Sequence, residues 1–191
     1  MASKRANKRD WLETGLGVLR QDGARALTVE RLCDELDLTK GSFYHHFKGI
    51  TGFRTDLLAH YEAEHTSRFI AEAETAGDSA RERLQRLQDL VLDAEGGDGG
   101  GGEDIDSAIR SWALQDPEAH AVQERVDRAR VAYLRALWQG LGGPEADVEP
   151  MARLLYLVLV GAQQVVPPVT AAQLREVYAL ALRLAPQEDP S

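Results

Sequence analysis

The sequence predicts an all-α protein, and three observations lead to that prediction. Apolar residues recur with the period of a helix along almost the whole chain, no segment alternates as a strand does, and glycine or proline breaks separate runs of helical length. We therefore expect about nine helices. With 191 residues, 43% of them apolar and 28% charged, the chain can bury a substantial core.

The expected helices follow one another with short breaks between them. An Asp-Gly pair ends the first helix, and an Asp-Pro pair, a GLGGPE stretch and a Pro-Pro pair end later ones. The expected ranges are 8–21, 29–36, 40–46, 51–75, 79–94, 105–114, 117–140, 146–166 and 171–184. Residues 95–104 contain so many glycines that too little apolar surface remains to offset the entropy of ordering them, so we expect a flexible loop there.

The second and third helices are short and are joined by a tight turn. Thr28 is a favourable N-cap for the second helix, whose apolar stripe includes Cys33 as a small core residue. Thr39 caps the third helix, in which Phe43 and Phe47 face inward one turn apart. This arrangement predicts a helix-turn-helix.

The helix expected at 146–166 is apolar on nearly every face between Met151 and Val160. A helix that is apolar all round must be covered all round, and a bundle of this size covers one side of it. We therefore expect a homodimer formed through helices 146–166 and 171–184. The alternative is that 146–166 is the central core helix of a monomer.

Charge is distributed unevenly along the chain. The net charge is −9, but residues 1–60 carry ten basic and eight acidic side chains, so that part is +2 and the remainder is −11. A mildly basic head on an acidic body indicates a module that binds a polyanion at one end, although a solvated basic face would look the same.

The exposed face of the third helix supports a DNA-reading role. At about 100° per residue, Gly41 and His45 point outward when the two phenylalanines face inward. The N-terminal residues of a recognition helix reach base edges, and Lys40 and Ser42 have the chemistry to do so. Side chains on the flanks and backbone N–H groups at helix starts suit phosphates. The candidate DNA contacts from this geometry are Thr28, Thr39, Lys40, Gly41, Ser42, Tyr44, His45 and His46.

The stretch LTVERLCDELDLTKGSFYHHF, residues 27–47, resembles the N-terminal domain of TetR-family (TetR/AcrR) transcriptional regulators. In that family a small residue and an aliphatic or aromatic one precede Tyr-x-His-Phe, and residues 42–47 meet this pattern. The resemblance covers about residues 8–58. It implies a DNA-binding domain in residues 1–50 and a ligand-binding and dimerisation domain in residues 51–191.

The resemblance also implies partners. A dimer presents two recognition helices to successive major grooves, so its double-stranded DNA operator would be a near-palindrome. A small-molecule effector in the helical body would shift the fourth helix and release a repressor from that operator. The family commonly has glycine where Asp37 stands and a phosphate-binding lysine where Ile50 stands, and Lys48 is the candidate to replace that lysine.

Polar residues in the helical body are candidates for the effector site, because a ligand pocket is mostly apolar with a few polar groups. Each of these residues could instead have a purely structural role, in the core, in an ion pair or in the subunit interface. The candidates are Tyr61, His65, Arg110, Trp112, Asp116, Gln163 and Gln164.

Other classes of function find little support in the sequence. No triad order, paired carboxylates or cofactor motif stands out, so we expect no enzyme and no cofactor, and His60 with Glu64 lacks a third metal ligand. A single cysteine, no opening signal peptide and no apolar run long enough for a bilayer predict a cytoplasmic protein. The remaining alternative is a helical interaction or ligand-binding protein that has lost DNA binding. The replacement of the family's phosphate-binding lysine by Ile50 would be consistent with that alternative.

Overall fold

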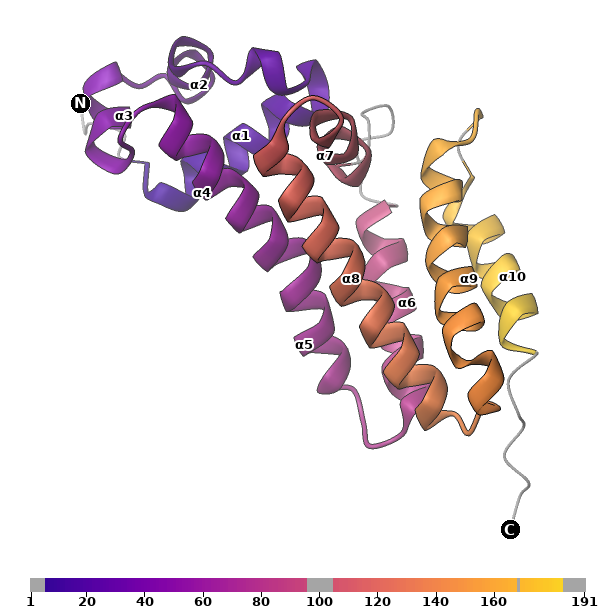
Figure 1. The fold of residues 1–191 in the computed structure, drawn as a ribbon. Coiled ribbons are helices and arrows are strands. Elements are labelled where there is room, and N and C mark those ends of the chain that lie inside the picture. Colours follow the sequence, from indigo (N-terminus) through magenta and orange to yellow (C-terminus); the bar gives the residue numbers. More distant parts are fainter. Residues whose placement is uncertain (1–5, 96–104, 168, 184–191) are drawn as a thin grey trace. The chain divides into compact units, whose positions relative to one another are not determined.

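The computed structural model describes residues 6–95, 105–167 and 169–183, and in these ranges it consists of helices joined by short turns and loops, with no strand (Figure 1). This confirms the predicted all-α class. The π-helix η2 joins α4 to α5. If these three segments are counted as one continuous helix, the described residues form nine helices besides the short 3-10 helix η1. The glycine-rich segment expected to be a flexible loop lies outside the described residues, apart from Glu95, which ends α6.

Most helix ends agree with the predicted ranges to within two residues. The 3-10 helix η1 and the π-helix η2 were not predicted. In chain order the helices are α1 (Lys8–Asp22), η1 (Ala24–Ala26), α2 (Val29–Leu36), α3 (Lys40–His46), α4 (Ile50–Glu62), η2 (Ala63–Ser67), α5 (Arg68–Glu74), α6 (Ala80–Glu95), α7 (Ile105–Ala113), α8 (Pro117–Gly140), α9 (Glu145–Gln164) and α10 (Ala171–Leu182).

The chain divides into two compact units. Unit 1 contains residues 1–64 and 101–124, and unit 2 contains residues 65–100 and 125–191. Unit 1 therefore holds α4 and α7 in addition to the three helices of the predicted DNA-binding domain. Two helical stretches, α4–η2–α5 and α8, begin in unit 1 and end in unit 2.

Aromatic rings form the centre of unit 1. Phe43 of α3 and Phe53 of α4 are completely buried, with ring centroids 5.7 Å apart, and the Trp11 ring of α1 meets Phe43 edge-on at 5.5 Å. The ring of Phe47 lies 4.9 Å from that of Phe53. These contacts confirm that Phe43 and Phe47 face inward. They also hold α3 against α1 and α4.

Close packing at Gly15 and left-handed backbone at Asp37 account for the residue type at these two positions of unit 1. A Cβ atom on Gly15 of α1 would lie 2.6 Å from the Phe53 ring, so a glycine lets α1 and α4 approach closely. Asp37 ends α2 in the left-handed conformation, with φ 55°. Left-handed backbone disfavours most side chains but is tolerated by Asp and Asn.

A π-helix interrupts the long helix between α4 and α5, and an arginine of α8 binds it. Arg130 donates from Nε to Thr66 Oγ1 at 3.1 Å and from its terminal guanidinium to the His65 carbonyl at 3.0 Å. Thr66 is buried. A π-helix is rare and widens the helical turn, which changes where backbone carbonyls point. Arg130 therefore stabilises this wider turn within unit 2.

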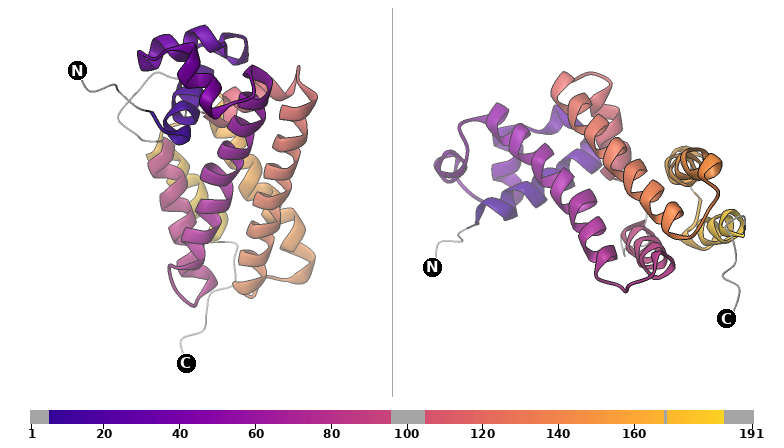
Figure 2. Two further views of the ribbon diagram at one scale, coloured as in Figure 1. Left: turned by 90° about the vertical axis from the view of Figure 1, so that its left-hand side faces the viewer. Right: turned by 60° about the horizontal axis from the view of Figure 1, so that its bottom comes forward.

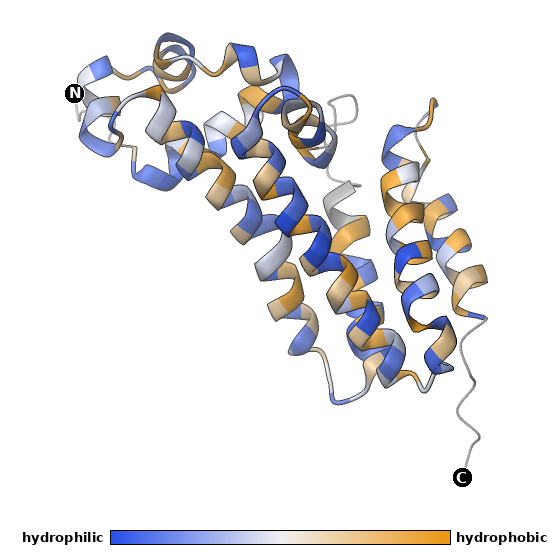
Figure 3. Ribbon diagram, in the orientation of Figure 1, coloured by the Kyte–Doolittle hydropathy of each residue, from blue (hydrophilic) through white to orange (hydrophobic). Residues whose placement is uncertain are grey.

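In unit 2, α9 and α10 lie side by side (Figure 2). The buried faces of the two helices share a cluster with Leu92 of α6, and Tyr178 of α10 donates to the Leu155 carbonyl of α9 at 3.3 Å. Hydrophobic residues recur along both helices (Figure 3), and some of them, among them Leu157 and Leu180, are exposed. No helix in the described ranges is long and apolar enough to cross a membrane.

Candidate nucleic-acid interface

The predicted helix-turn-helix is present, and both predicted caps are made. Thr28 Oγ1 accepts from the Arg31 backbone N–H at 3.1 Å, and Thr39 Oγ1 accepts from the Ser42 backbone N–H at 3.3 Å. A side-chain cap satisfies one of the N–H groups that a helix start leaves unpaired. Cys33 is buried between these caps, and its burial raises the pKa of its thiol, as fits a core residue.

The side of α3 that faces away from the aromatic core is exposed. Tyr44 has 58% of its surface accessible, and Lys40, Gly41 and His45 are also exposed. Ser42 is half-buried beside them. The structure therefore brings most of the predicted DNA contacts onto one small surface, with the caps of α2 and α3 in the same unit.

Gly41 has open space around it. A Cβ atom there would meet only Thr39 Oγ1, at an ordinary 3.6 Å, and its backbone is not in the left-handed region. Packing and backbone geometry within the described protein thus give no reason for glycine, which costs up to about 1 kcal/mol in a helix relative to alanine. The lack of a side chain leaves room for another molecule to approach the α3 backbone.

Lys40 is paired with an acid of α2. Its Nζ donates to Glu30 Oε1, and this hydrogen bond raises the pKa of the Lys40 ammonium and lowers the pKa of the Glu30 carboxyl. Both side chains are exposed. Glu30 was not among the predicted site residues, because ten positions separate it from Lys40 and only the fold brings the two together.

His46 lies closer to the N-terminal segment than to the centre of the exposed face. It is half-buried, and its Nε2 lies 3.1 Å from the Ala6 carbonyl oxygen. Lys8 and Arg9 are the first two residues of α1. Lys8 forms an ion pair with Asp56 at 2.8 Å, and Arg9 forms one with Glu64 at 3.1 Å. Both cations are therefore paired with acids of unit 1.

A second cationic position follows α3. Lys48 is exposed and has no ion-pair partner among the described residues. Immediately after it, α4 begins at Ile50 with Gly49 as its N-cap and without a side-chain cap. The first N–H groups of such a helix have no intrahelical partner and attract anions. The predicted start of this helix was Thr51, and its N–H groups were not among the predicted phosphate contacts.

The predicted effector contacts in unit 1 have structural partners. Tyr61 is buried and donates to Asp106 of α7, and Trp112 is buried on the same helix as Arg110. The Asp116 carboxylate accepts from the backbone N–H groups of residues 118 and 119, at 2.9 and 3.0 Å, and so caps α8.

The other predicted effector contacts belong to unit 2. His65 lies in η2, where its carbonyl accepts from Arg130, and Gln163 and Gln164 are the last residues of α9. The seven candidates are therefore divided between the two units. Their role as effector contacts remains a prediction. None of them lines the groove between α6 and α10 of unit 2.

No cluster of three metal-ligating side chains occurs in the described ranges. His60 and Glu64 are each engaged elsewhere, with Glu13 at 2.9 Å and Arg9 at 3.1 Å.

Residues 12–54 match the family model described as bacterial regulatory proteins, tetR family. The N-terminal segment of the chain thus matches the TetR family. The match spans most of α1, all of α2 and α3, and the start of α4, which is the segment whose geometry is described above. Comparison with curated protein sequences gives no significant match.

Several solved structures share the fold of the chain. The reduced form of NemR from E. coli has a TM-score of 0.78 at 17% identity, covering 95% of this chain and 99% of that one. A TetR transcriptional regulator from Legionella pneumophila has a TM-score of 0.75 at 12% identity, covering 96% and 100%. A TetR-family regulator from Streptomyces coelicolor has a TM-score of 0.73 at 16% identity, covering 95% and 89%. At these identities the likeness establishes the fold alone, and with the family match it supports a DNA-binding regulator.

Proposed function

We propose that this protein is a dimeric TetR-family transcriptional repressor that binds a near-palindromic operator and is released from it by a small-molecule effector. The observation that carries the DNA-binding part is the exposed face of α3, with Gly41 at its centre and Lys40, Tyr44 and His45 around it. The N-terminal part of such a helix enters the major groove. Lys40 and Ser42 would reach base edges, while Thr28, Thr39, Tyr44, His46 and Lys48 would contact phosphates.

Exposed apolar side chains on α9 and α10 support the dimer. Leu157 is 65% exposed and Leu180 is 58% exposed, and Leu154 and Val177 are also exposed. Gly161 of α9 has no atom within 4 Å of where its Cβ would stand, so a partner helix could approach closely there. Exposed large apolar side chains on two neighbouring helices typically mark a protein–protein contact. We assign it to a second copy of the chain.

In the proposed dimer the two α3 helices would lie in successive major grooves. The half-sites would then be separated by about 34–36 Å, or one turn of DNA. The acidic remainder of the chain, at −11 against +2 for residues 1–60, would help to orient the duplex toward the α3 face. Such a regulator acts where the DNA is, which in a bacterium is the cytoplasm.

Release by an effector requires two conformations of the dimer that differ in the distance between the two α3 helices. The effector must bind the conformation that does not fit the operator more tightly than the one that does. A preference of about 3 kcal/mol would lower operator affinity by about 100-fold. We propose that the change travels along α4–η2–α5, because this helix joins the two units and contains the π-helix that Arg130 holds.

The first test is selection of binding sites from a random duplex library with the purified protein, at low and at moderate salt. We expect a palindrome with two half-sites, whose affinity falls steeply as salt increases because phosphate contacts release counterions. Failure to enrich any sequence, even at low salt, would overturn the proposed function. It would favour the alternative, a helical interaction or ligand-binding protein without DNA binding.

A further inference from the structure

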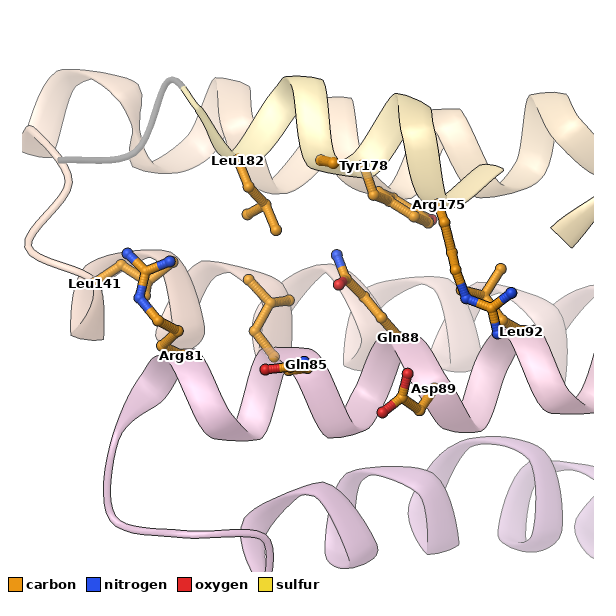
Figure 4. A pocket seen from close by; sticks show the side chains of 11 residues that line it. Arg81, Gln85, Gln88, Asp89, Leu92, Leu141, Arg175, Tyr178 and Leu182 are labelled. Atoms are coloured by element: carbon orange, nitrogen blue, oxygen red, sulfur yellow. The ribbon is translucent and has the colours of Figure 1, made fainter. Parts of the chain in front are cut away.

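Unit 2 contains a groove between α6 and α10 (Figure 4). Its volume is about 340 Å³, within the range of small-molecule sites. Its apolar lining comes from α6, from α10 and from the residue that follows α8. The lining residues of this kind are Leu84, Leu92, Leu141, Tyr178, Ala179 and Leu182.

An arginine stands at each end of the groove. Arg81, at the start of α6, lies near Leu141, and Arg175 reaches from α10 toward Leu92 (Figure 4). The positions of Arg81 and Leu92 on α6 are separated by about 16 Å at 1.5 Å per residue. Neither guanidinium has an ion-pair or hydrogen-bond partner among the described residues. Asp89 is the acidic residue of the lining, so the lining as a whole carries net positive charge.

A polar side chain lies between the two arginines. The Gln88 amide points from α6 toward α10 (Figure 4), and its nitrogen is buried with no hydrogen-bond acceptor in the described protein. An unpaired buried donor costs free energy that an acceptor atom would recover. The groove thus has cations at both ends, apolar side chains between them, and the amides of Gln85 and Gln88 along α6.

The groove would remain accessible in the proposed dimer. At about 100° per residue, Arg175, Tyr178, Ala179 and Leu182 share one face of α10, and Val177 with Leu180 lie on the opposite face. The apolar surface assigned to the second subunit is therefore not the surface that lines the groove.

We propose that this groove binds the effector and that the effector is an elongated apolar molecule with an anionic group at each end. This inference rests on the function proposed above, because it names the ligand class of that regulator. The two guanidiniums bind the terminal anions, and charge-assisted hydrogen bonds to them hold the molecule along the groove. A ligand with one charged end leaves one arginine unpaired.

The groove is also connected to the helix that joins the two units. Besides lining the groove, α6 packs against α5, with ion pairs between Arg83 and Glu74 at 3.2 Å and between Arg86 and Glu72 at 3.4 Å. Since α5 continues from α4 through η2, a ligand that moves α6 acts directly on this helix.

The test uses the full chain without DNA and decanedioate as the probe, with decanoate and decanediol as comparisons, measured by titration calorimetry. We expect decanedioate to bind more tightly than either comparison. Arg81→Gln and Arg175→Gln should each raise its Kd by about tenfold, the loss of one charge-assisted contact. Arg153→Gln, an exposed arginine outside the groove whose ion pair with Glu149 lies within α9, should leave the Kd unchanged. If decanoate binds as tightly as decanedioate, or if one of the two groove variants has no effect, the assignment of a two-ended anion is wrong.

A second measurement separates this inference from the proposed function. Fluorescence anisotropy of the selected operator is recorded with and without saturating decanedioate, and we expect weaker operator binding with it. Binding of decanedioate that leaves operator affinity unchanged overturns the effector assignment while DNA binding stands. Failure to bind any operator overturns the proposed function, and the calorimetry still reports on the groove.

Discussion

Lys40, the first residue of α3, forms an ion pair with Glu30 of α2, so the lysine best placed to reach a base is held by an acid of its own helix-turn-helix. For Lys40 to contact DNA, its ion pair with Glu30 would have to break. Glu30 would thereby lower operator affinity without contacting the duplex itself.

Replacing Glu30 with Gln should strengthen DNA binding. The change releases Lys40 and removes a negative charge near the phosphates, so operator affinity should rise severalfold at low salt. Anisotropy titrations over a range of salt concentrations measure it. The matched control is Glu35→Gln, which removes an exposed acid of the same helix that pairs with Arg31 at 2.9 Å. Equal gains for both variants would mean that net charge alone, and not the Lys40 pair, is responsible.

Gly41→Ala should separate stability from DNA binding. Because a Cβ there meets nothing closer than 3.6 Å, the free energy of unfolding should rise, by up to about 1 kcal/mol. Operator affinity should nevertheless fall, because the methyl group stands where DNA approaches α3. Gly17→Ala is the control, since Gly17 of α1 also has open space, and it should stabilise without changing affinity. Undiminished operator binding by Gly41→Ala would remove the main argument for α3 as the reader.

Asp37→Gly should stabilise the helix-turn-helix. Asp37 has φ 55°, a conformation that glycine adopts without the steric cost of a side chain, so unfolding in urea should require about 0.5–1 kcal/mol more. Asp34→Gly, three residues earlier and inside α2, should have the opposite sign, because glycine weakens a helix interior. Two changes of the same sign would contradict the conformational explanation.

Arg130→Ala should destabilise unit 2. The variant leaves Thr66 Oγ1 and the His65 carbonyl without the arginine's donors, and the free energy of unfolding should fall by about 1–3 kcal/mol. Thr66→Val removes only the hydroxyl contact and should cost less. Arg130→Lys should recover only part of the loss, since an ammonium cannot reproduce the planar fork. If Arg130→Ala is no more destabilising than Thr66→Val, the bond to the His65 carbonyl contributes little.

Leu157→Glu combined with Leu180→Glu should dissociate the dimer. Both side chains are more than half exposed in the single chain, so the charges should leave its folding intact. Sedimentation should then report a monomer, and operator binding should weaken strongly because two half-sites are no longer read together. Leu114→Glu, at a position 85% exposed after α7, is the control and should remain dimeric. A dimer that survives the double change would place the interface elsewhere.

The sequence predicted the helix-turn-helix well because its signals are local. Thr28 and Thr39 cap helices that begin one residue later, and Phe43 and Phe47 lie one turn apart on the same helix. Each of these relationships is contained within a few residues. The all-α class was predictable for the same reason, since helical periodicity is read within single segments.

Features that depend on distant residues were not predictable in this way. The π-helix η2 is held by Arg130, 64 positions away from Thr66, and nothing in residues 63–67 alone indicates the wider turn. The groove of Arg81 and Arg175 likewise exists only because α6 and α10 are neighbours. Polar residues of the helical body could be named from the sequence as effector contacts, but which helix faces meet is a property of the packing.

The division of the chain into two units has a consequence for engineering. Unit 1 is discontinuous in sequence, since residues 101–124 belong with residues 1–64, and Tyr61 of α4 finds its hydrogen-bond acceptor Asp106 on α7. A fragment ending at residue 50 or 64 would lack α7 and expose the buried Tyr61. Chimaeras that graft this head onto another body should therefore carry two pieces of chain, with splice points on either side of α7 as well as within the long helix.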